Sequence, residues 1–235
     1  MTLKIVVLNP KGGSGKTTIA TNLAACYAAR GFPSALVDRD PQGSSARWTT
    51  KRTEALARVH GVAAFKLPPN VTRSFAMRIP PEVVRVITDT PAAMDRQALV
   101  EVTRDVDRII VPVLPSDIDI HAAARCIADL LVAAKIPRHG NRLAVVANRV
   151  KRNTVMFRSL MRFLDALDIP IAAVLRDSQN YIRAAESGIG LHEMKPPSVA
   201  RVDVEQWEHL FAWIEEGRVT PADALWRNEA PVATP

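Results

Sequence analysis

Residues 9 to 18 read Asn-Pro-Lys-Gly-Gly-Ser-Gly-Lys-Thr-Thr, and this stretch decides the fold of the chain. An apolar run over residues 3–8 precedes it, and a helical pattern follows from Ile19. Strand, glycine-rich loop and helix in this order form the context that a phosphate-binding loop requires. The sequence therefore predicts a parallel α/β fold with a nucleotide phosphate site at its first loop.

Each residue type in this loop has a role in phosphate binding. Gly12, Gly13 and Gly15 allow backbone angles closed to other residues, so that successive N–H groups turn toward phosphate oxygens. Lys16 is expected to contact the β and γ phosphates, and the Thr17 hydroxyl to bind Mg²⁺. The predicted nucleotide-binding residues are Lys11, Gly12, Gly13, Ser14, Gly15, Lys16, Thr17 and Thr18, together with Asn148 from further along the chain.

Lys11 departs from the ordinary loop, in which a glycine comes first and is followed by four residues and Gly-Lys-Ser/Thr. A second lysine is redundant within one site, but it has a use if it reaches phosphates held by another copy of the chain. In this Lys-Gly-Gly-Ser-Gly-Lys-Thr pattern the sequence resembles the ParA/MinD family of deviant Walker A ATPases. The resemblance covers about residues 1–215 and is strongest to the small ParA proteins that position plasmids or carboxysomes.

The resemblance implies a three-layer P-loop NTPase fold, with a mostly parallel central sheet flanked by helices. It implies an ATPase of slow intrinsic turnover that uses ATP and Mg²⁺ and pairs as a homodimer over two ATP molecules, each Lys11 acting on the phosphates of the other subunit. It also implies non-specific double-stranded DNA as a partner, and an adaptor protein that stimulates hydrolysis and links the switch to its cargo. The catalytic residues are then Lys11, Lys16 and Asp40.

Composition agrees with a single domain. A chain of 235 residues with 48% hydrophobic content fits one α/β domain, expected over residues 1–219, with a tail over 220–235. No apolar run approaches the roughly 18 residues of a membrane span, and the chain enters its first strand without a cleavable signal, so we expect a cytoplasmic location. Cys26 and Cys126 stand alone in helical patterns, which favours reduced core residues.

Acidic residues close two further apolar runs. Asp38 and Asp40 follow the run 34–37 in an Asp-Arg-Asp-Pro-Gln sequence, and Asp89 follows the run 83–87. By resemblance Asp40 orients the attacking water and Asp38 lies near the Mg²⁺ ion. Asp89 matches the Walker B acid that holds Mg²⁺ through a water. The alternative for the first pair is a capped helix start before Ser44.

Two more polar residues follow strands. Asp119 lies in a segment similar to a family loop on the nucleotide side of the dimer, and the alternative is a helix cap. Asn148 closes the run 143–147, where the family places an adenine-reading asparagine; an amide both donates and accepts on one adenine edge.

The loop after Asp89 departs from the family, because Ala92 replaces a second proline, and this puts the stiffness of the loop in doubt.

Positive charge is concentrated late in the chain. The net charge is +7, and residues 138–183 carry nine basic and three acidic side chains, a net +6. Helix 154–167 presents Arg158 and Arg162 four residues apart on one face. The predicted DNA-binding residues are Lys151, Arg152, Arg158, Arg162 and Arg183, of which Arg152 and Arg183 match family positions. DNA binding would imply a nucleoid-associated location. The alternative to DNA binding is an ordinary solvated basic face.

The remaining pattern gives the other elements. Strands are predicted over 3–8, 34–37, 83–87, 108–113, 143–147 and 171–175, and helices over 18–30, 44–58, 120–134, 154–167, 179–186 and 204–216. Residues 61–81 form a variable insert to which we assign no chemistry. Helix 204–216 has an acidic polar face, whereas a MinD-like membrane protein needs a basic one, so we expect no membrane partner. A metabolic ligase on the same fold is the other rival.

Overall fold

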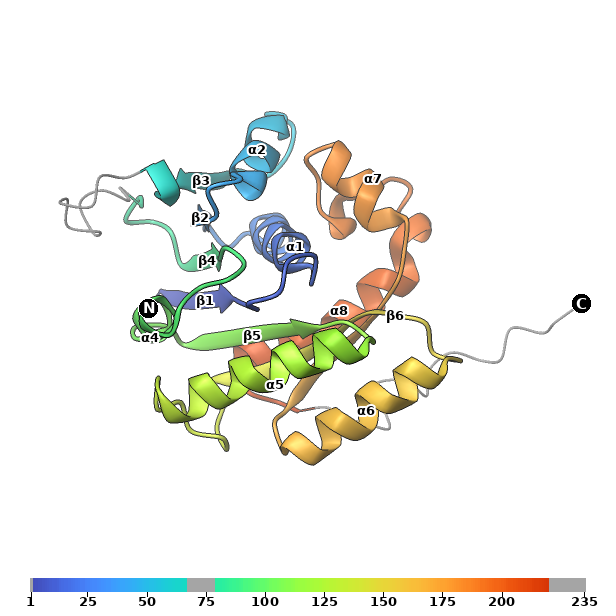
Figure 1. Cartoon of the computed structure of the whole chain (residues 1–235). Coiled ribbons are helices and arrows are strands. Elements are labelled where there is room, and N and C mark those ends of the chain that lie inside the picture. The colour runs from blue at the N-terminus through green and yellow to red at the C-terminus, as the bar shows by residue number, and fades with distance from the viewer. Residues whose placement is uncertain (1, 67–78, 220–235) are drawn as a thin grey trace, which may run out of the picture.

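The computed structural model describes residues 2–66 and 79–219, and in this part of the chain seven strands form one sheet (Figure 1). The strands are β1 (Leu3–Val7), β2 (Ser34–Asp38), β3 (Val59–Ala63), β4 (Arg85–Asp89), β5 (Arg108–Val113), β6 (Leu143–Val150) and β7 (Ile171–Arg176). Their order across the sheet is β3-β2-β4-β1-β5-β6-β7, and each neighbouring pair is parallel. The predicted α/β fold with a parallel central sheet is confirmed.

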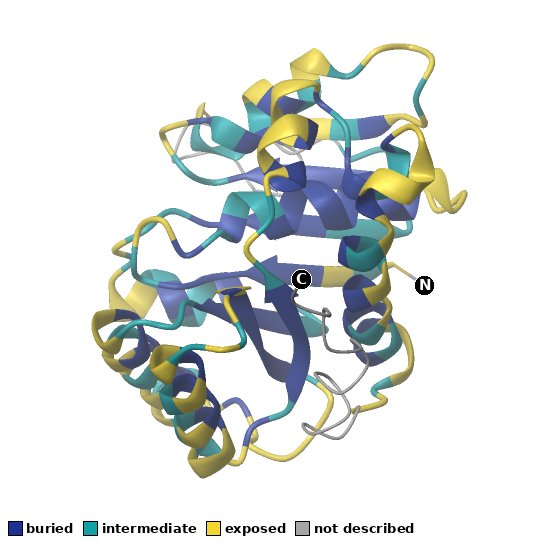
Figure 2. Cartoon of the chain, turned by 90° about the vertical axis from the view of Figure 1, so that its right-hand side faces the viewer, coloured by how far each residue is buried: buried dark blue, intermediate teal, exposed yellow. Residues whose placement is uncertain are grey.

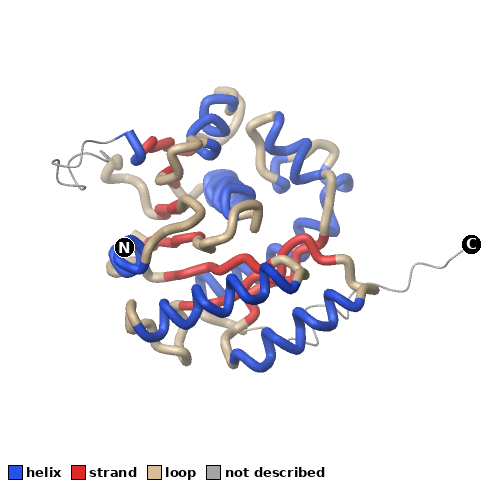
Figure 3. The backbone as a smooth tube through the Cα atoms, in the orientation of Figure 1, coloured by secondary structure: helices blue, strands red, loops and turns tan. Residues whose placement is uncertain are grey.

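Helices cover both faces of this sheet (Figure 3). They are α1 (Lys16–Ala29), α2 (Ser44–Lys51), α4 (Arg96–Thr103), α5 (Asp117–Val132), α6 (Val155–Leu167), α7 (Asn180–Glu186) and α8 (Arg201–Glu216), with short 3-10 turns η1 (Ala64–Lys66), η2 (Leu191–Glu193) and η3 (Pro197–Ala200). Parallel strands need crossover connections, and here helices follow β1, β2, β4, β5, β6 and β7. The result is the expected three-layer arrangement.

Alternation along the strands builds a separate core on each face. In β1, Ile5 and Val7 pack with α1 and α8, whereas Val6 packs with α5 and α6 on the opposite side. Successive strand side chains point to opposite faces of a sheet, so a continuous apolar run is buried on both sides. Figure 2 shows the central strands as buried and the outer helix faces as exposed.

The structure corrects the sequence-based prediction in the first half of the chain. The helix predicted over 44–58 ends at Lys51, because Arg52 takes extended backbone angles. Residues 59–63 then form β3, an edge strand that we did not predict, and its glycine, Gly61, weakened the strand signal. Helix α4 was also not predicted; Asp95 caps it by accepting a hydrogen bond from the Ala98 N–H at 2.7 Å. Residues 67–78 of the expected insert, and the expected tail 220–235, lie outside the described residues.

The C-terminal helix packs on the sheet, as expected. Trp207, Trp213 and Ile214 of α8 are fully buried against the core that β7 and α1 share. Both cysteines are buried and free, which confirms their prediction as reduced core residues. Within the described residues no helix is both long and apolar enough to cross a membrane.

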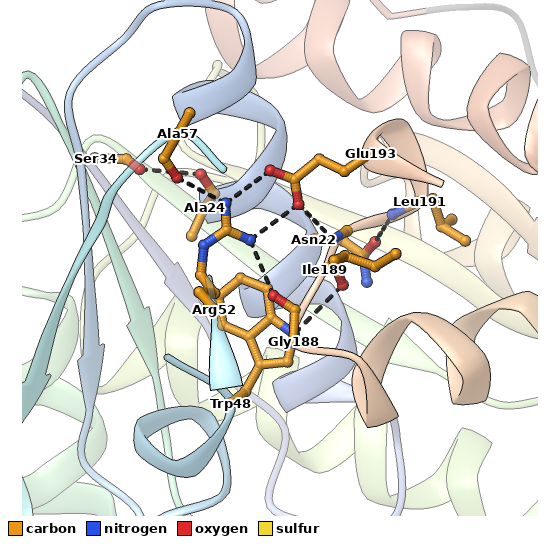
Figure 4. A network of polar contacts seen from close by, with 11 residues as sticks. Asn22, Ala24, Ser34, Trp48, Arg52, Ala57, Gly188, Ile189, Leu191 and Glu193 are labelled. Atoms are coloured by element: carbon orange, nitrogen blue, oxygen red, sulfur yellow. Dashed lines mark hydrogen bonds and ion pairs between the residues drawn. The ribbon is translucent and has the colours of Figure 1, made fainter. Parts of the chain in front are cut away.

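A buried ion pair joins the end of α2 to the segment after α7 (Figure 4). Arg52 donates to both carboxylate oxygens of Glu193, at 2.7 and 2.9 Å, and both side chains are 6% exposed. The same guanidinium donates to the carbonyls of Ala57 and Gly188 and lies over the ring of Trp48. This contact fixes α2, and therefore the loop between Asp38 and α2, against the C-terminal part of the chain.

Candidate nucleotide-binding site

The predicted acids and the glycine-rich loop meet at the carboxyl edge of the sheet. Strand β4 lies between β1 and β2, and Asp89 is in register with Val7 on one side and with Asp38 on the other. The loop 8–15 leaves β1 at this edge and leads into α1. Carboxyl ends of parallel strands form the binding crevice of open α/β sheets, so the topology places these groups where a ligand would bind.

The loop has the backbone geometry of a phosphate cradle. Gly13 and Gly15 take φ values of +78° and +94°, in the left-handed region that favours glycine, and Gly12 does not. A Cβ atom placed on Gly12 or Gly13 would meet no atom within 4 Å, so open space lies beside the loop. Helix α1 begins at Lys16, and its N-terminal N–H groups face the loop. The residues present therefore fit a bound phosphate chain.

Two asparagines hold the loop in place. Asn9, which is fully buried, donates to the Pro112 carbonyl at 2.6 Å and accepts from the Lys11 N–H at 2.8 Å. Asn148 donates from Nδ2 to the Ser14 carbonyl at 2.9 Å. The loop is thereby tied to β5 on one side and to β6 on the other.

A bulge in β6 aims Asn148 at the loop. The pairing of β6 with β7 shifts between Ala147 and Val150, and Arg149 inside this irregularity takes a φ of +51°. Bulges next to functional sites commonly redirect a side chain. A Cβ on Gly15 would lie 2.2 Å from the Asn148 amide nitrogen, so the close contact requires glycine there. The adenine-reading role of Asn148 stays a prediction.

The two lysines of the loop point to different places. The Lys16 ammonium donates to the Lys11 carbonyl at 3.2 Å and lies near Asp89 and Asp40. Burial lowers the pKa of Lys16, and the two carboxylates act in the opposite direction. The Lys11 ammonium contacts Asp119 at 2.5 Å instead. One lysine thus belongs to the cradle and the other does not.

Asp119 is not the cap of α5. Ser116 is the N-cap, and its hydroxyl accepts from the Asp119 N–H at 3.2 Å and also contacts the Asp119 carboxylate. The helix starts at Asp117, three residues before the predicted start, so Asp119 lies inside its first turn. The capping alternative was therefore wrong for this residue, and the carboxylate is left to pair with Lys11.

Asp89 has an environment suited to a divalent cation. Its two carboxylate oxygens are buried and make no hydrogen bond of normal geometry within the described residues, although the hydroxyls of Thr17 and Ser45 lie near them. Burial raises the pKa of Asp89 to about 7; the hydroxyls of Thr17 and Ser45 and the Lys16 ammonium lower it, and Asp38 raises it. Unpaired buried carboxylate oxygens are costly, and a hydrated Mg²⁺ ion would satisfy them. The donor set of Asp89 and Thr17 fits that ion.

Asp38 and Asp40 differ in their burial and in the number of hydrogen bonds that their carboxylates accept. Asp38 is fully buried, and its oxygens accept from the N–H groups of Asp40 and Ala46 at 2.9 and 2.8 Å. The bond to Ala46 gives a partner to a free N–H group in the first turn of α2. Asp38 therefore also acts in the capped helix start before Ser44 that we gave as the alternative. Asp40 is half-exposed, and one of its oxygens accepts from the Gln42 N–H at 2.9 Å. Asp40 is therefore the acid with room for another partner.

The loop after β4 is tied to the glycine-rich loop. The Ala93 N–H donates to the Pro10 carbonyl at 2.8 Å, and Ala93 takes a φ of +56°. The Thr90 hydroxyl donates to the Val7 carbonyl at 2.9 Å. These bonds hold the segment in which Ala92 replaces the family's proline.

The basic residues of the segment 138–183 divide into paired and unpaired groups. Arg149 pairs with Asp177, Arg176 pairs with Asp203, and Arg142 donates to two carbonyls. The unpaired group, which we call the free cations, makes no side-chain hydrogen bond or ion pair within residues 2–66 and 79–219 and consists of Lys151, Arg158, Arg162 and Arg183. Arg152 is half-buried and does have a partner.

The free cations do not form one row. Arg158 and Arg162 are exposed on α6, which packs on one face of the sheet, and Arg183 is exposed on α7 on the other face. Figure 1 shows these two helices on opposite sides of the sheet. The DNA-binding role of the five predicted residues stays a prediction.

Sequence reasoning missed four residues of this site: Asn9, Ser45, Thr90 and Ser116. Asn9 and Thr90 each lie one or two residues beyond the end of a buried strand, next to the strand ends at which we selected the acids, so their position could have indicated them. Ser116 precedes an apolar helical run and is a preferred N-cap type. Nothing in the sequence indicates that Ser45 would lie beside Asp89, because that contact depends on the path of the loop into α2.

Comparison with known proteins agrees with this geometry. Residues 5–191 match the model of the CobQ/CobB/MinD/ParA nucleotide binding domain. The chain is 29% identical, over 81% of its own length and 87% of the relative's, to the maintenance of carboxysome distribution protein A of Halothiobacillus neapolitanus. Among solved structures it is similar to a variant of McdA from Cyanothece in complex with ATP, with a TM-score of 0.65, 17% identity and coverage of 89% and 96%. A candidate plasmid partition protein from Borrelia burgdorferi B31 bound to AMPPNP has a TM-score of 0.71, 12% identity and coverage of 93% and 100%.

Proposed function

The chain belongs to the CobQ/CobB/MinD/ParA nucleotide-binding family, and on that premise we propose that it is a ParA-type ATPase switch. Two copies pair over two ATP molecules, and the pair binds double-stranded DNA without sequence specificity. A partner protein stimulates hydrolysis, which returns the chains to the single state. The name of the Halothiobacillus relative supports a carboxysome as the cargo; a plasmid or chromosome origin is the alternative.

One observation carries this proposal. The glycine-rich loop holds two lysines, and only Lys16 is buried in the cradle, where its ammonium donates a hydrogen bond to the Lys11 carbonyl. The Lys11 side chain leaves the loop and remains one-third exposed. A phosphate site complete with its own lysine does not need the second one. Lys11 is therefore not needed at the phosphates of its own chain, and once its contact with Asp119 is released it can reach those of a second copy, where its charge would stabilise the transition state.

The chain's own groups bind and orient the nucleotide. Backbone N–H groups of residues 12–18 and the Lys16 ammonium hold the phosphates. Thr17 and Asp89 would hold Mg²⁺, Asp89 through a water, and Asp38 fixes the loop that carries Asp40. Bound Mg²⁺ would neutralise charge on the β and γ phosphates. Asn148 stays the predicted contact to adenine.

Asp40 is the residue that orients the attacking water. It is half-exposed beside the cradle, and Lys16 lies near it. Phosphoryl transfer needs positioning and neutralisation of charge more than a strong base. We therefore expect slow turnover by the single chain, and faster turnover when pairing and the partner protein complete the site.

The free cations supply the DNA contacts. Each exposed Lys or Arg that neutralises a phosphate releases counterions and adds to a salt-dependent affinity that ignores base sequence. Pairing doubles the number of such contacts per particle. ATP should therefore convert weak contact into strong binding, and the nucleoid becomes the surface on which the switch works.

The alternative function, a MinD-like ATPase that binds the membrane, has less support. A peripheral membrane helix must expose an apolar face toward lipid. In α8 that face, with Trp207 and Trp213, is buried in the core. The polar face carries Glu205, Glu208 and Glu216, which anionic lipid would repel.

Retention on immobilised DNA in the presence of ADP, ATP or a non-hydrolysed ATP analogue, across a salt series, tests the proposal. We expect retention with ATP and the analogue only, loss of retention for Lys11→Ala, and prolonged retention with ATP for Asp40→Ala. Lys4→Ala, at an exposed lysine on β1, is the matched control for charge. Equal retention of the wild-type chain with every nucleotide would overturn the switch. Turnover that responds to a small carboxylate, and not to DNA or partner, would favour the ligase rival.

A further inference from the structure

Lys11 is already held by a partner in its own chain. Its ammonium lies 2.5 Å from Oδ2 of Asp119, a residue 108 positions away in the first turn of α5. The Asp119 side chain is 3% exposed, and the Lys11 side chain is 33% exposed. An ammonium in this contact points to α5 and cannot at the same time lie on the phosphates of a second copy.

The Asp119 carboxylate keeps one contact in its own helix and one open oxygen when the lysine leaves. The Ser116 hydroxyl contacts Oδ2, and the carboxylate lies at the positive end of α5. Oδ1 is buried and makes no hydrogen bond within the described residues, so the carboxylate keeps capacity for a cation. A preformed anionic receptor of this kind competes with phosphate for the same ammonium.

We propose that Asp119 is a positioning residue that holds Lys11 in the single chain and sets the nucleotide concentration at which two chains pair. The inference rests on the proposed function and deepens it, because it names what restrains the lysine before pairing. Release of Lys11 breaks one ion pair, and contact with a triphosphate on the facing chain replaces it. The strength of the first pair therefore subtracts from the free energy of pairing.

The test is the nucleotide concentration at half-maximal pairing, measured by sedimentation velocity with a non-hydrolysed ATP analogue. Asp119→Asn keeps the shape of the side chain and removes its charge, and we expect it to lower this midpoint about tenfold. The matched control is Asp117→Asn, two residues earlier in the same turn. The Asp117 side chain is 80% exposed and lies near His121, not Lys11. We expect its midpoint to stay within twofold of the wild type.

A double-mutant cycle separates positioning from general stability. Lys11→Ala should remain single, and adding Asp119→Asn should not restore pairing, because the residue acts through the lysine. A midpoint that is unchanged or higher in Asp119→Asn, while the wild type pairs normally, overturns the inference alone. A wild-type chain that stays single at every nucleotide concentration overturns both the inference and the proposed function.

Chemical labelling of the wild-type chain keeps the test independent of whether Asp119→Asn folds. In nucleotide-free protein, acylation of the Lys11 amine, followed by mass spectrometry of its peptide, should be at least tenfold slower than that of exposed Lys135. In Asp119→Asn the Lys11 rate should rise toward the Lys135 rate, and in Asp117→Asn it should not. Equal rates for Lys11 and Lys135 in the wild-type chain would contradict the contact on which the inference depends.

Discussion

The side-chain amide of Asn148 donates a 2.9 Å hydrogen bond to the carbonyl oxygen of Ser14, which joins the end of β6 to the middle of the glycine-rich loop. Both residues are buried, and Gly15 lies against the same amide. The bond links the strand expected to carry adenine recognition to the loop expected to carry phosphate recognition. Strain introduced at this junction should therefore reach both halves of a bound nucleotide.

Gly15→Ala should weaken ADP binding at least tenfold, measured by calorimetry. Alanine at a φ of +94° is strained by roughly 1–2 kcal/mol, and its Cβ would lie 2.2 Å from the Asn148 nitrogen, which must move. Gly31→Ala is the matched control, because it shares a φ of +82° but its Cβ meets no atom within 4 Å. Equal ADP affinity in the two variants would show that the contact with Asn148 is unimportant.

Asp89→Asn should change the pH dependence of stability in chelator without nucleotide. Burial raises the pKa of Asp89 from 3.8 to about 7, so the folded chain binds this proton more tightly than the unfolded chain does. The free energy of unfolding of the wild-type chain therefore falls as the pH rises from about 4 to about 7. Asp89→Asn does not lose this stability. The free energy of unfolding of the variant minus that of the wild type should therefore rise between pH 4 and pH 8 by on the order of a few kcal/mol, because each pKa unit corresponds to about 1.4 kcal/mol.

Urea denaturation at several pH values measures this difference. Asp105→Asn, at an exposed position, is the control, and its difference from the wild type should not depend on pH in this way. A constant difference between Asp89→Asn and the wild type from pH 4 to pH 8 would mean that Asp89 titrates normally. In that case the site would lack the dry, unpaired carboxylate that we ascribe to the metal position.

Replacement of Arg158 and Arg162 by alanine should flatten the salt dependence of DNA binding. Each phosphate contact contributes about 0.9 to the slope of log affinity against log salt concentration, so the double variant should lose about 2 from the slope if both residues contact phosphate. Arg58→Ala with Lys66→Ala is the matched control, because both residues are exposed and flank β3, at the opposite edge of the sheet from β7. An equal loss in the control pair would indicate general electrostatics rather than a defined face.

Glu193→Ala should destabilise the chain by about 3 kcal/mol, because it leaves the Arg52 guanidinium buried without its carboxylate. The control is Glu205→Ala, which breaks an exposed pair with Arg201 in α8 and should cost less than about 0.5 kcal/mol. Thermal and urea denaturation measure both. Similar costs for the two variants would show that the ion pair beside Trp48 does not anchor α2.

The sequence predicted the centre of the fold well, because its signals there are local. The run 3–8, the glycine-rich loop and the following helix are neighbours in the chain, and a continuous apolar run is typical of a strand buried on both faces. The same reasoning located Asp89 and Asn148 at strand ends. Edge strand β3 and helix α4 were missed because both are short, of five and eight residues, and Gly61 interrupts the pattern of β3.

The contact of Lys11 with Asp119 could not be predicted from the sequence. The two residues are 108 positions apart, and their meeting depends on β1 and β5 being adjacent in the sheet. From the sequence we expected Lys11 to point toward a second copy, and a helix cap was one role for Asp119. Only the three-dimensional arrangement shows that each residue gives the other a partner within one chain.

The mass of the wild-type chain in solution, measured by light scattering with saturating non-hydrolysed ATP analogue and with ADP, tests the central claim most directly. The account predicts a mass near the single-chain value of 25.7 kDa with ADP, and twice that value with the analogue. Lys11→Ala should show the single-chain mass in both states. A wild-type chain that keeps the single-chain mass when loaded with the analogue would contradict the account.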